Sequence, residues 1–221
     1  MEREKRELPK KDRRNERGVT LIEIMIASMF FSLLSFALFS TITSAGTILQ
    51  MQTLSAGINQ GGMQLLRSIV REIAESSPAA DQSHLILATD ASGNSIATFQ
   101  VPVDWDNDGD VVQSVLTQTL EWGAYRSVRE PQQQSWLNGW VRYRIVNGQL
   151  LREVLTASNG TVLATDILVP RDVLAFQVTL VSRRVSIVLT IRKADTLGQK
   201  GANARTYQAT FDGDVLLRNG G

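Results

Sequence analysis

Four aspartates lie close together in the stretch DWDNDGD. Asp104, Asp106 and Asp108 occupy alternate positions and are followed by Gly109 and Asp110. A tight turn at the glycine would bring three carboxylates to one point, and the backbone carbonyl of Asp110 would add a fourth oxygen, a donor set suited to Ca²⁺. Aspartates packed so closely repel one another unless a cation neutralises them. The spacing predicts a calcium site formed by Asp104, Asp106, Asp108 and Asp110.

The loop is not a complete EF-hand. Its twelfth position, where a glutamate would bind the ion with both oxygens, is Val115. Glu121 or another distant residue would have to supply the missing ligand. A solvated turn between strands, which needs no metal, is the alternative. The later Asp212-Gly213-Asp214 lacks the alternating repeat and is expected to be a turn or bulge.

Glu23 is a carboxylate in an otherwise apolar run, where a bilayer would penalise it by about 2.5 kcal/mol or more. The run from Ile24 to Ile42 holds 19 uncharged residues. As a helix it would span roughly 28 Å at 1.5 Å per residue, close to a hydrocarbon core of about 30 Å. We therefore predict a membrane-spanning segment at about residues 24–42.

The charges around this segment predict its orientation. The first 18 residues contain eight Lys/Arg and five Asp/Glu, and the next charge after Glu23 is Arg67. The positive-inside rule places the N-terminus in the cytoplasm and exports the chain beyond about residue 45. Serines and threonines in the run can bond back to the helix and allow close helix packing. A plain anchor, or a signal peptide cleaved near Thr43-Ser44-Ala45, is the alternative.

Composition excludes several kinds of chemistry. The chain has no cysteine and a single histidine, His84, which removes disulfides, thiolate sites and most histidine-based triads and zinc sites. The net charge is +1 and would be −2 without the first 18 residues, so no nucleic-acid partner is expected. No Gly-rich phosphate loop follows a strand. We predict that the chain is not an enzyme.

The order of features at the N-terminus is a basic leader, Gly18, then Val19-Thr20-Leu21-Ile22-Glu23 and an apolar helix. It resembles the cleavage and methylation motif of type IV pilins and type II secretion pseudopilins. By that resemblance a prepilin peptidase cuts after Gly18, Val19 becomes the methylated first residue, and Glu23 becomes the fifth residue of the mature chain. Most of the family begins with Phe, so Val19 is a departure.

Proteolysis after Gly18 would also give Glu23 a physical purpose. It would create an α-amine beside the apolar helix, and Glu23 of a neighbouring subunit could neutralise that amine, because two buried charges cost less together than apart. The simpler alternative is an acid tolerated in the first turn, where the helix dipole favours it.

The elements that position these residues follow from periodicity. Apolar residues recur at helical spacing beyond the membrane run at Leu54, Ile58, Leu65, Ile69 and Ile73, with Gly61 or Gly62 in the gap. One helix from about Thr20 to Glu75 is expected, ended by Ser76-Ser77-Pro78. The expected organisation is a leader (1–18), a long helix (19–76) and an exported β domain (77–221).

The rest of the chain reads as strands separated by turn residues. The expected strands are His84–Thr89, Ser95–Val103, Val111–Trp122, a hairpin over Trp140–Leu155 that turns at Asn147-Gly148, Thr161–Val169, Val173–Val181, Arg184–Arg192 and Arg205–Leu217. Alternation within them indicates an antiparallel sheet with one face on the helix. The predicted fold class is α+β and pilin-like.

This part is similar to J-type pseudopilins and W-type minor pilins in the hairpin VRYRIVNGQLLRE, the strand pair around AFQVTLVSRRVSIVLTIR and the closing VLLRN. The resemblance implies a minor subunit that helps to start a type IV pilus or a type II secretion pseudopilus near its tip. Its expected partners are the prepilin peptidase, other pilins or pseudopilins, the inner-membrane assembly platform and the membrane. A membrane-anchored periplasmic binding protein is the alternative, and a secreted enzyme with an uncleaved anchor is a weaker one.

Overall fold

The computed structural model describes residues 19–76, 84–105, 110–114, 119–126, 135–194 and 206–218. The chain divides into two compact units, residues 1–50 and 51–221. Helix α1 (Leu21–Ala74) begins in the first unit and ends in the second. The predicted bounds of about Thr20 to Glu75 are thus confirmed to within one residue at each end.

In the first unit, the start of α1 is capped by Thr20. The backbone N–H of Glu23 donates to Thr20 Oγ1 at 3.3 Å, as expected of a threonine N-cap. Hydroxyl groups along the helix donate to carbonyls one turn earlier, as from Ser32 to Ser28 O (2.8 Å) and from Thr41 to Ala37 O (2.9 Å). The apolar helix therefore satisfies these hydroxyls internally, as the sequence predicted.

In the second unit, α1 buries a stripe of residues against the sheets. The buried members are Ile58, Gly62, Leu66, Ile69, Glu72, Ile73 and Ala74. Gly62 fills the predicted gap, and a Cβ there would overlap the ring of Phe211. Leu65, predicted to belong to the stripe, is half-buried, and its neighbour Leu66 is buried instead.

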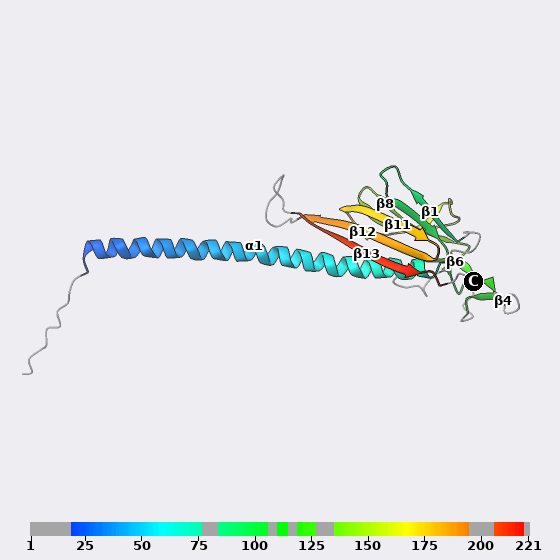
Figure 1. Ribbon diagram of the computed structural model, residues 1–221, viewed down its shortest axis with the longest axis horizontal. Helices are drawn as coiled ribbons and strands as arrows, with labels where there is room; N and C mark the ends of the chain where they lie inside the picture. The colour runs from blue at the N-terminus through cyan, green and yellow to red at the C-terminus, as the bar shows by residue number, and fades with distance from the viewer. Residues whose placement is uncertain are drawn as a thin grey trace, which may run out of the picture. The chain divides into compact units, whose positions relative to one another are not determined.

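All strand pairs are antiparallel, which confirms the coarse α+β class (Figure 1). The larger sheet has the order β1-β2-β8-β9-β10, and a second has the order β11-β12-β13. Their strands are β1 (Leu85–Thr89), β2 (Ser95–Phe99), β8 (Trp140–Val146), β9 (Gln149–Leu155), β10 (Val162–Val169), β11 (Val173–Val181), β12 (Arg184–Ala194) and β13 (Thr206–Leu216). Small sheets are β3-β6-β7, from β3 (Val101–Pro102), β6 (Trp122–Tyr125) and β7 (Ser135–Leu137), and β4-β5, from β4 (Val112–Ser114) and β5 (Thr119–Leu120).

The hairpin prediction at Asn147-Gly148 is confirmed. Val146 pairs with Gln149, and the two turn residues have φ of 52° and 74°, the left-handed pair that a type I′ turn requires.

Two strand predictions are wrong, and one strand was not predicted. The segment Val111–Trp122 forms β4, β5 and the start of β6 instead of one strand, and Ser95–Val103 breaks at Gln100. There the Gln100 amide donates to Gly139 O at 3.1 Å, and the chain passes from the larger sheet to the β3-β6-β7 sheet. Strand β7 was not predicted. The structure therefore has several sheets where one was expected. The alternation of apolar and polar residues does not show where a strand leaves one sheet and joins another.

The expectation of a turn or bulge at Asp212-Gly213-Asp214 is also wrong, because these residues lie inside β13 and pair with β12 without a register shift. A Cβ at Gly213 would lie 3.1 Å from Val70 Cγ2 and 3.2 Å from Leu66 Cδ2. The glycine allows α1 to approach the strand closely, which is the other common reason for glycine within a sheet.

Candidate functional site

The start of α1 carries the predicted processing and assembly residues. Val19 and Glu23 are exposed, as are the large apolar side chains that follow, such as Phe31 and Phe36. Gly18 lies outside the described residues. An apolar helical surface of this extent indicates a lipid or protein partner, since soluble proteins rarely expose such patches.

Within the described part of the chain, α1 is the one helix long and apolar enough to cross a membrane, and its most apolar stretch is not buried. A membrane anchor and a signal sequence share this property. In this stretch Glu23 is the sole charge before Arg67.

The acidic loop is described at its two ends. Asp106, Asp108 and Gly109 lie outside the described residues, while Asp104 is half-buried and Asp110 Oδ1 accepts from the backbone N–H of Val111 at 2.7 Å. Among the residues that the structure describes, no group of three or more His, Asp or Glu could hold a metal ion.

Glu121, the residue considered as a further ligand, lies at the base of this loop. Its side chain is buried, and Oε2 accepts from the backbone N–H of Trp105 at 3.2 Å. Its backbone carbonyl accepts from the N–H of Val103 at 2.8 Å. A carboxylate from the single residue between β5 and β6 is therefore held against the first residues of the loop.

A buried ion pair that the sequence did not predict joins α1 to the larger sheet. The guanidinium of Arg152 donates to both carboxylate oxygens of Glu72, with its shortest contact 2.5 Å. The phenol of Tyr143 donates to Glu72 as well. Arg152 also donates to the carbonyls of Tyr125 (2.9 Å) and Arg126 (3.1 Å). The side chain of Arg152 is 0% exposed and that of Glu72 is 7% exposed.

Each charge in this cluster is held by its partner. Burial alone would lower the pKa of Arg152, but the attraction and hydrogen bonds of Glu72 more than offset it and raise that pKa. Burial raises the pKa of Tyr143 well above its usual value, and the neighbouring Glu72 carboxylate adds to the effect. Tyr143 therefore stays protonated as a donor to Glu72.

One signal could have revealed this cluster. Glu72 falls on the buried stripe of α1, three residues after Ile69, and a charge on a buried stripe requires a partner. Its partner Arg152 lies 80 residues further along the chain, and spacing gives no indication of such a pair.

A second carboxylate, Glu153, lies between two arginines across β8 and β9. It binds Arg142 at 2.7 Å and Arg144 at 2.8 Å, and its side chain is 4% exposed. Burial would raise the pKa of Glu153, but the hydrogen bonds from Arg144 and Arg142 outweigh burial and lower it. This cross-strand cluster stabilises the charged form of Glu153.

Comparison of the chain with protein-family models, with curated proteins and with solved structures finds no match.

Proposed function

We propose that the chain is a minor pilin or pseudopilin that helps to start assembly of a type IV pilus or a type II secretion pseudopilus near its tip. In this proposal a prepilin peptidase removes residues 1–18, and Val19 is methylated. The assembly platform of the inner membrane then moves the subunit from the bilayer into a bundle with other pilins or pseudopilins. The protein is first a single-pass inner-membrane protein with its N-terminus in the cytoplasm.

The observation that carries the proposal is the start of α1. A capped helix begins at Leu21 with one carboxylate in its first turn, and exposed apolar side chains follow for several turns. An ionisable group within a membrane segment is functional by default. The α-amine that cleavage after Gly18 would create supplies the positive partner for Glu23.

The antiparallel unit on residues 51–74 of α1 supports the proposal in a second way. The ion pair between Glu72 and Arg152 fastens the end of the helix to the larger sheet. A subunit drawn out of a bilayer by its helix needs such a connection, because the helix must carry the β unit with it.

N-terminal sequencing and intact mass of the protein purified from its own membranes test the processing step. We expect a chain that starts at Val19 and is heavier by one methyl group. A chain that starts at Met1 would support a simple tether, and one that starts at Gly46 would support secretion.

Filament incorporation of a Glu23→Gln variant tests the assembly step. We expect processing to be retained and incorporation to be lost, because the amine of the neighbour would then be buried without a countercharge. A Glu75→Gln variant, which removes a carboxylate just after the end of the same helix and far from the membrane run, is the control. Normal incorporation of Glu23→Gln would refute the assembly role.

We also propose that the acidic loop binds Ca²⁺ through Asp104, Asp106, Asp108 and Asp110, with Glu121 as the additional carboxylate. The position of Glu121 against the backbone of Trp105 supports this role, since carboxylate oxygens are the ligands that Ca²⁺ prefers. Thermal unfolding with Ca²⁺ and with a chelator is the test. We expect a higher midpoint with Ca²⁺ and no such shift in an Asp108→Asn/Asp110→Asn variant, and equal midpoints would argue against the site.

A membrane-anchored binding protein is the second candidate. The side chain of Trp105 is 50% exposed beside the acidic loop, and an exposed indole is a common contact in binding surfaces. The N-terminal sequence separates the two candidates, because a binding protein has no need of a start at Val19.

A further inference from the structure

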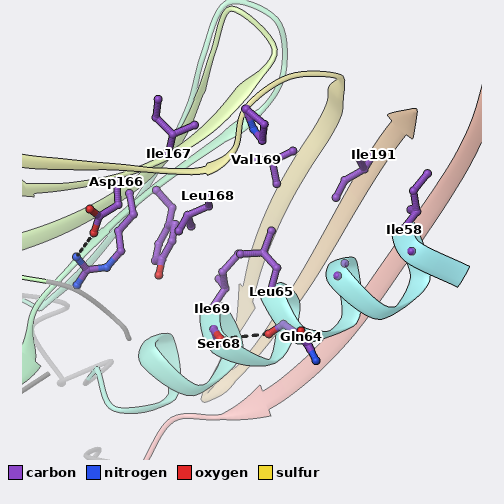
Figure 2. A pocket seen from close by; sticks show the side chains of 16 residues that line it. Ile58, Gln64, Leu65, Ser68, Ile69, Asp166, Ile167, Leu168, Val169 and Ile191 are labelled. Carbon is purple, nitrogen blue, oxygen red and sulfur yellow. Dashed lines mark hydrogen bonds and ion pairs between the residues drawn. The ribbon is translucent and has the colours of Figure 1, made fainter. Parts of the chain in front are cut away.

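A groove of about 740 Å³ lies within residues 51–221, between α1 and β10 (Figure 2). Helix residues from Gly57 to Ile69 form one wall, and residues 166–170 form the other. Ile191 of β12 lies at the end near Ile58, while Asp166 lies toward the end near Ile69. Arg152 also lines the groove and lies 3.9 Å from Asp166.

The wall formed by β10 is the edge of a strand. Asp166, Ile167, Leu168, Val169 and Pro170 all line the groove. Successive side chains of a regular strand point to opposite faces. Consecutive residues line this space because β10 presents its backbone edge and has a register shift between Ile167 and Val169. β10 is also the last strand of the larger sheet, and among the described strands none pairs with its outer edge.

This edge has only part of the usual protection against pairing. Natural edge strands carry lysine or proline, contain bulges, or are covered. β10 has two irregularities in its pairing with β9, but it contains no lysine or proline and exposes apolar side chains at Val162, Leu163 and Ile167. The single charged residue within the strand is Asp166, which binds Arg126 at 3.3 Å.

The helical wall has room for another backbone. A Cβ built at Gly57 or at Gly61 would meet no atom within 4 Å, and neither glycine has a positive φ. Each glycine destabilises the helix relative to alanine. Nothing within the described chain requires glycine at these two positions.

The two ends of the groove differ in charge. Toward Ile69, Arg152 and Arg126 are balanced by Glu72 and Asp166. At the other end the chain continues from Pro170 and Ile191 into three cations, Arg171, Arg192 and Lys193.

A single carboxylate in the described residues faces this cationic end. Asp172 lies 3.9 Å from Arg171 and 3.8 Å from Arg192. Lys193 lies on the same face of β12 as Ile191, is exposed, and has no ion pair within the described part of the chain. The end of the groove near Ile191 therefore carries an excess of positive charge.

We propose that this groove binds an extended segment of a partner protein, which adds a strand to the edge of β10. Backbone groups of the segment pair with β10, and its apolar side chains enter the space beside Gly57 and Gly61. Acidic residues at one end of the segment meet Arg171, Arg192 and Lys193. Strand addition of this kind combines backbone hydrogen bonds with pockets for alternate side chains. The proposal is independent of filament assembly.

Blocked peptides that alternate valine and threonine, with two aspartates at the amino or the carboxyl end, are the probes. Binding to the full chain in lipid nanodiscs is measured by fluorescence anisotropy. The control for each peptide has the two aspartates replaced by lysines. We expect one of the two aspartate peptides to bind at least about tenfold more tightly than its lysine control. Replacement of alternate residues by proline, which removes backbone donors, should abolish binding.

Matched variants locate the site. Gly61→Leu places a side chain in the groove at a position where a Cβ meets no atom within 4 Å, and it should weaken binding by about tenfold or more. Gln60→Leu places the same side chain on an exposed position outside the groove and should leave binding unchanged. Lys193→Glu should reduce the preference for the acidic peptide.

Several results would overturn the proposal. These are no binding below about 1 mM, equal binding of acidic and basic peptides, or equal affinities for Gly61→Leu and the parent chain. Self-association that Gly61→Leu abolishes would identify a second copy as the occupant and would also overturn the proposal. None of these results bears on cleavage after Gly18, so failure here is distinct from failure of the proposed function.

Discussion

Replacement of Arg152 by methionine should strongly destabilise the unit formed by residues 51–221. The change removes the charge that compensates Glu72 and leaves the carboxylate buried with Tyr143 as its remaining donor. It also removes the donors to the carbonyls of Tyr125 and Arg126. Removal of one partner of a buried ion pair costs about 3–5 kcal/mol, because the other charge is then uncompensated.

The double variant Glu72→Gln/Arg152→Met isolates the interaction. Glutamine retains an acceptor for the phenol of Tyr143 but carries no charge, so the double variant should be less destabilised than the sum of the two single variants. We expect a coupling of about 2–3 kcal/mol, near the upper end for contacting residues. Arg71→Met, which removes an exposed cation one residue from Glu72, is the control and should change stability by less than about 0.5 kcal/mol.

Urea unfolding of the full chain in nanodiscs, followed by tryptophan fluorescence, measures these energies. All four tryptophans lie beyond residue 100, so the signal reports on the second unit. A loss below about 1 kcal/mol for Arg152→Met, or additive effects in the double variant, would refute the assignment of this pair as the main polar connection between α1 and the sheet.

Three further predictions use the same unfolding assay. Gly62→Ala should lower the free energy of unfolding by about 1–3 kcal/mol, because the new Cβ overlaps Phe211. Gly61→Ala should raise the free energy of unfolding by about 1 kcal/mol. Equal effects of the two changes would contradict the packing of Gly62 against Phe211. Gly148→Ala should cost about 1–2 kcal/mol, since its φ is 74°, and an unchanged midpoint would contradict the turn geometry. The pKa of Glu153 is lowered in the folded protein, so the charged carboxylate stabilises the fold at pH values above its unfolded pKa of about 4.5. This stabilisation is lost as the pH falls through the lower folded pKa. Glu153→Gln should therefore reduce the slope of stability against pH on the acid side, and an unchanged slope would contradict this.

The elements that were predicted correctly depend on local signals. The bounds of α1 follow from a continuous apolar run, a threonine cap and a following Ser-Ser-Pro. The turn at Asn147-Gly148 follows from residues that tolerate positive φ. The hydrogen bonds from hydroxyl groups to backbone carbonyls within α1 could be predicted because each serine or threonine lies one helical turn after the carbonyl that accepts. In each case the interacting atoms lie within a few residues of one another.

The features that were missed or wrongly predicted depend on distant partners. Gly213 was expected in a turn because glycine favours turns, whereas its position in β13 is explained by contact with Leu66 and Val70. The break at Gln100 depends on the carbonyl of Gly139. No local pattern indicates the role of Arg152, because its partner Glu72 lies 80 residues earlier in the chain. The calcium site and the role of Glu23 stay predictions.

The ion pair and the groove depend on the same rotation of α1. Each residue of an α-helix turns by about 100°, so a slip of one residue would move Gly57 and Gly61 away from β10. It would also remove Glu72 from Arg152, and in one of the two directions it would place Met63 against Phe211 in place of Gly62. Apolar residues alone tolerate small rotations, because Leu65 and Leu66 could exchange places in the stripe. A carboxylate held by both Arg152 and Tyr143 does not tolerate such a rotation. For this reason we infer that Glu72 determines which face of α1 lines the groove.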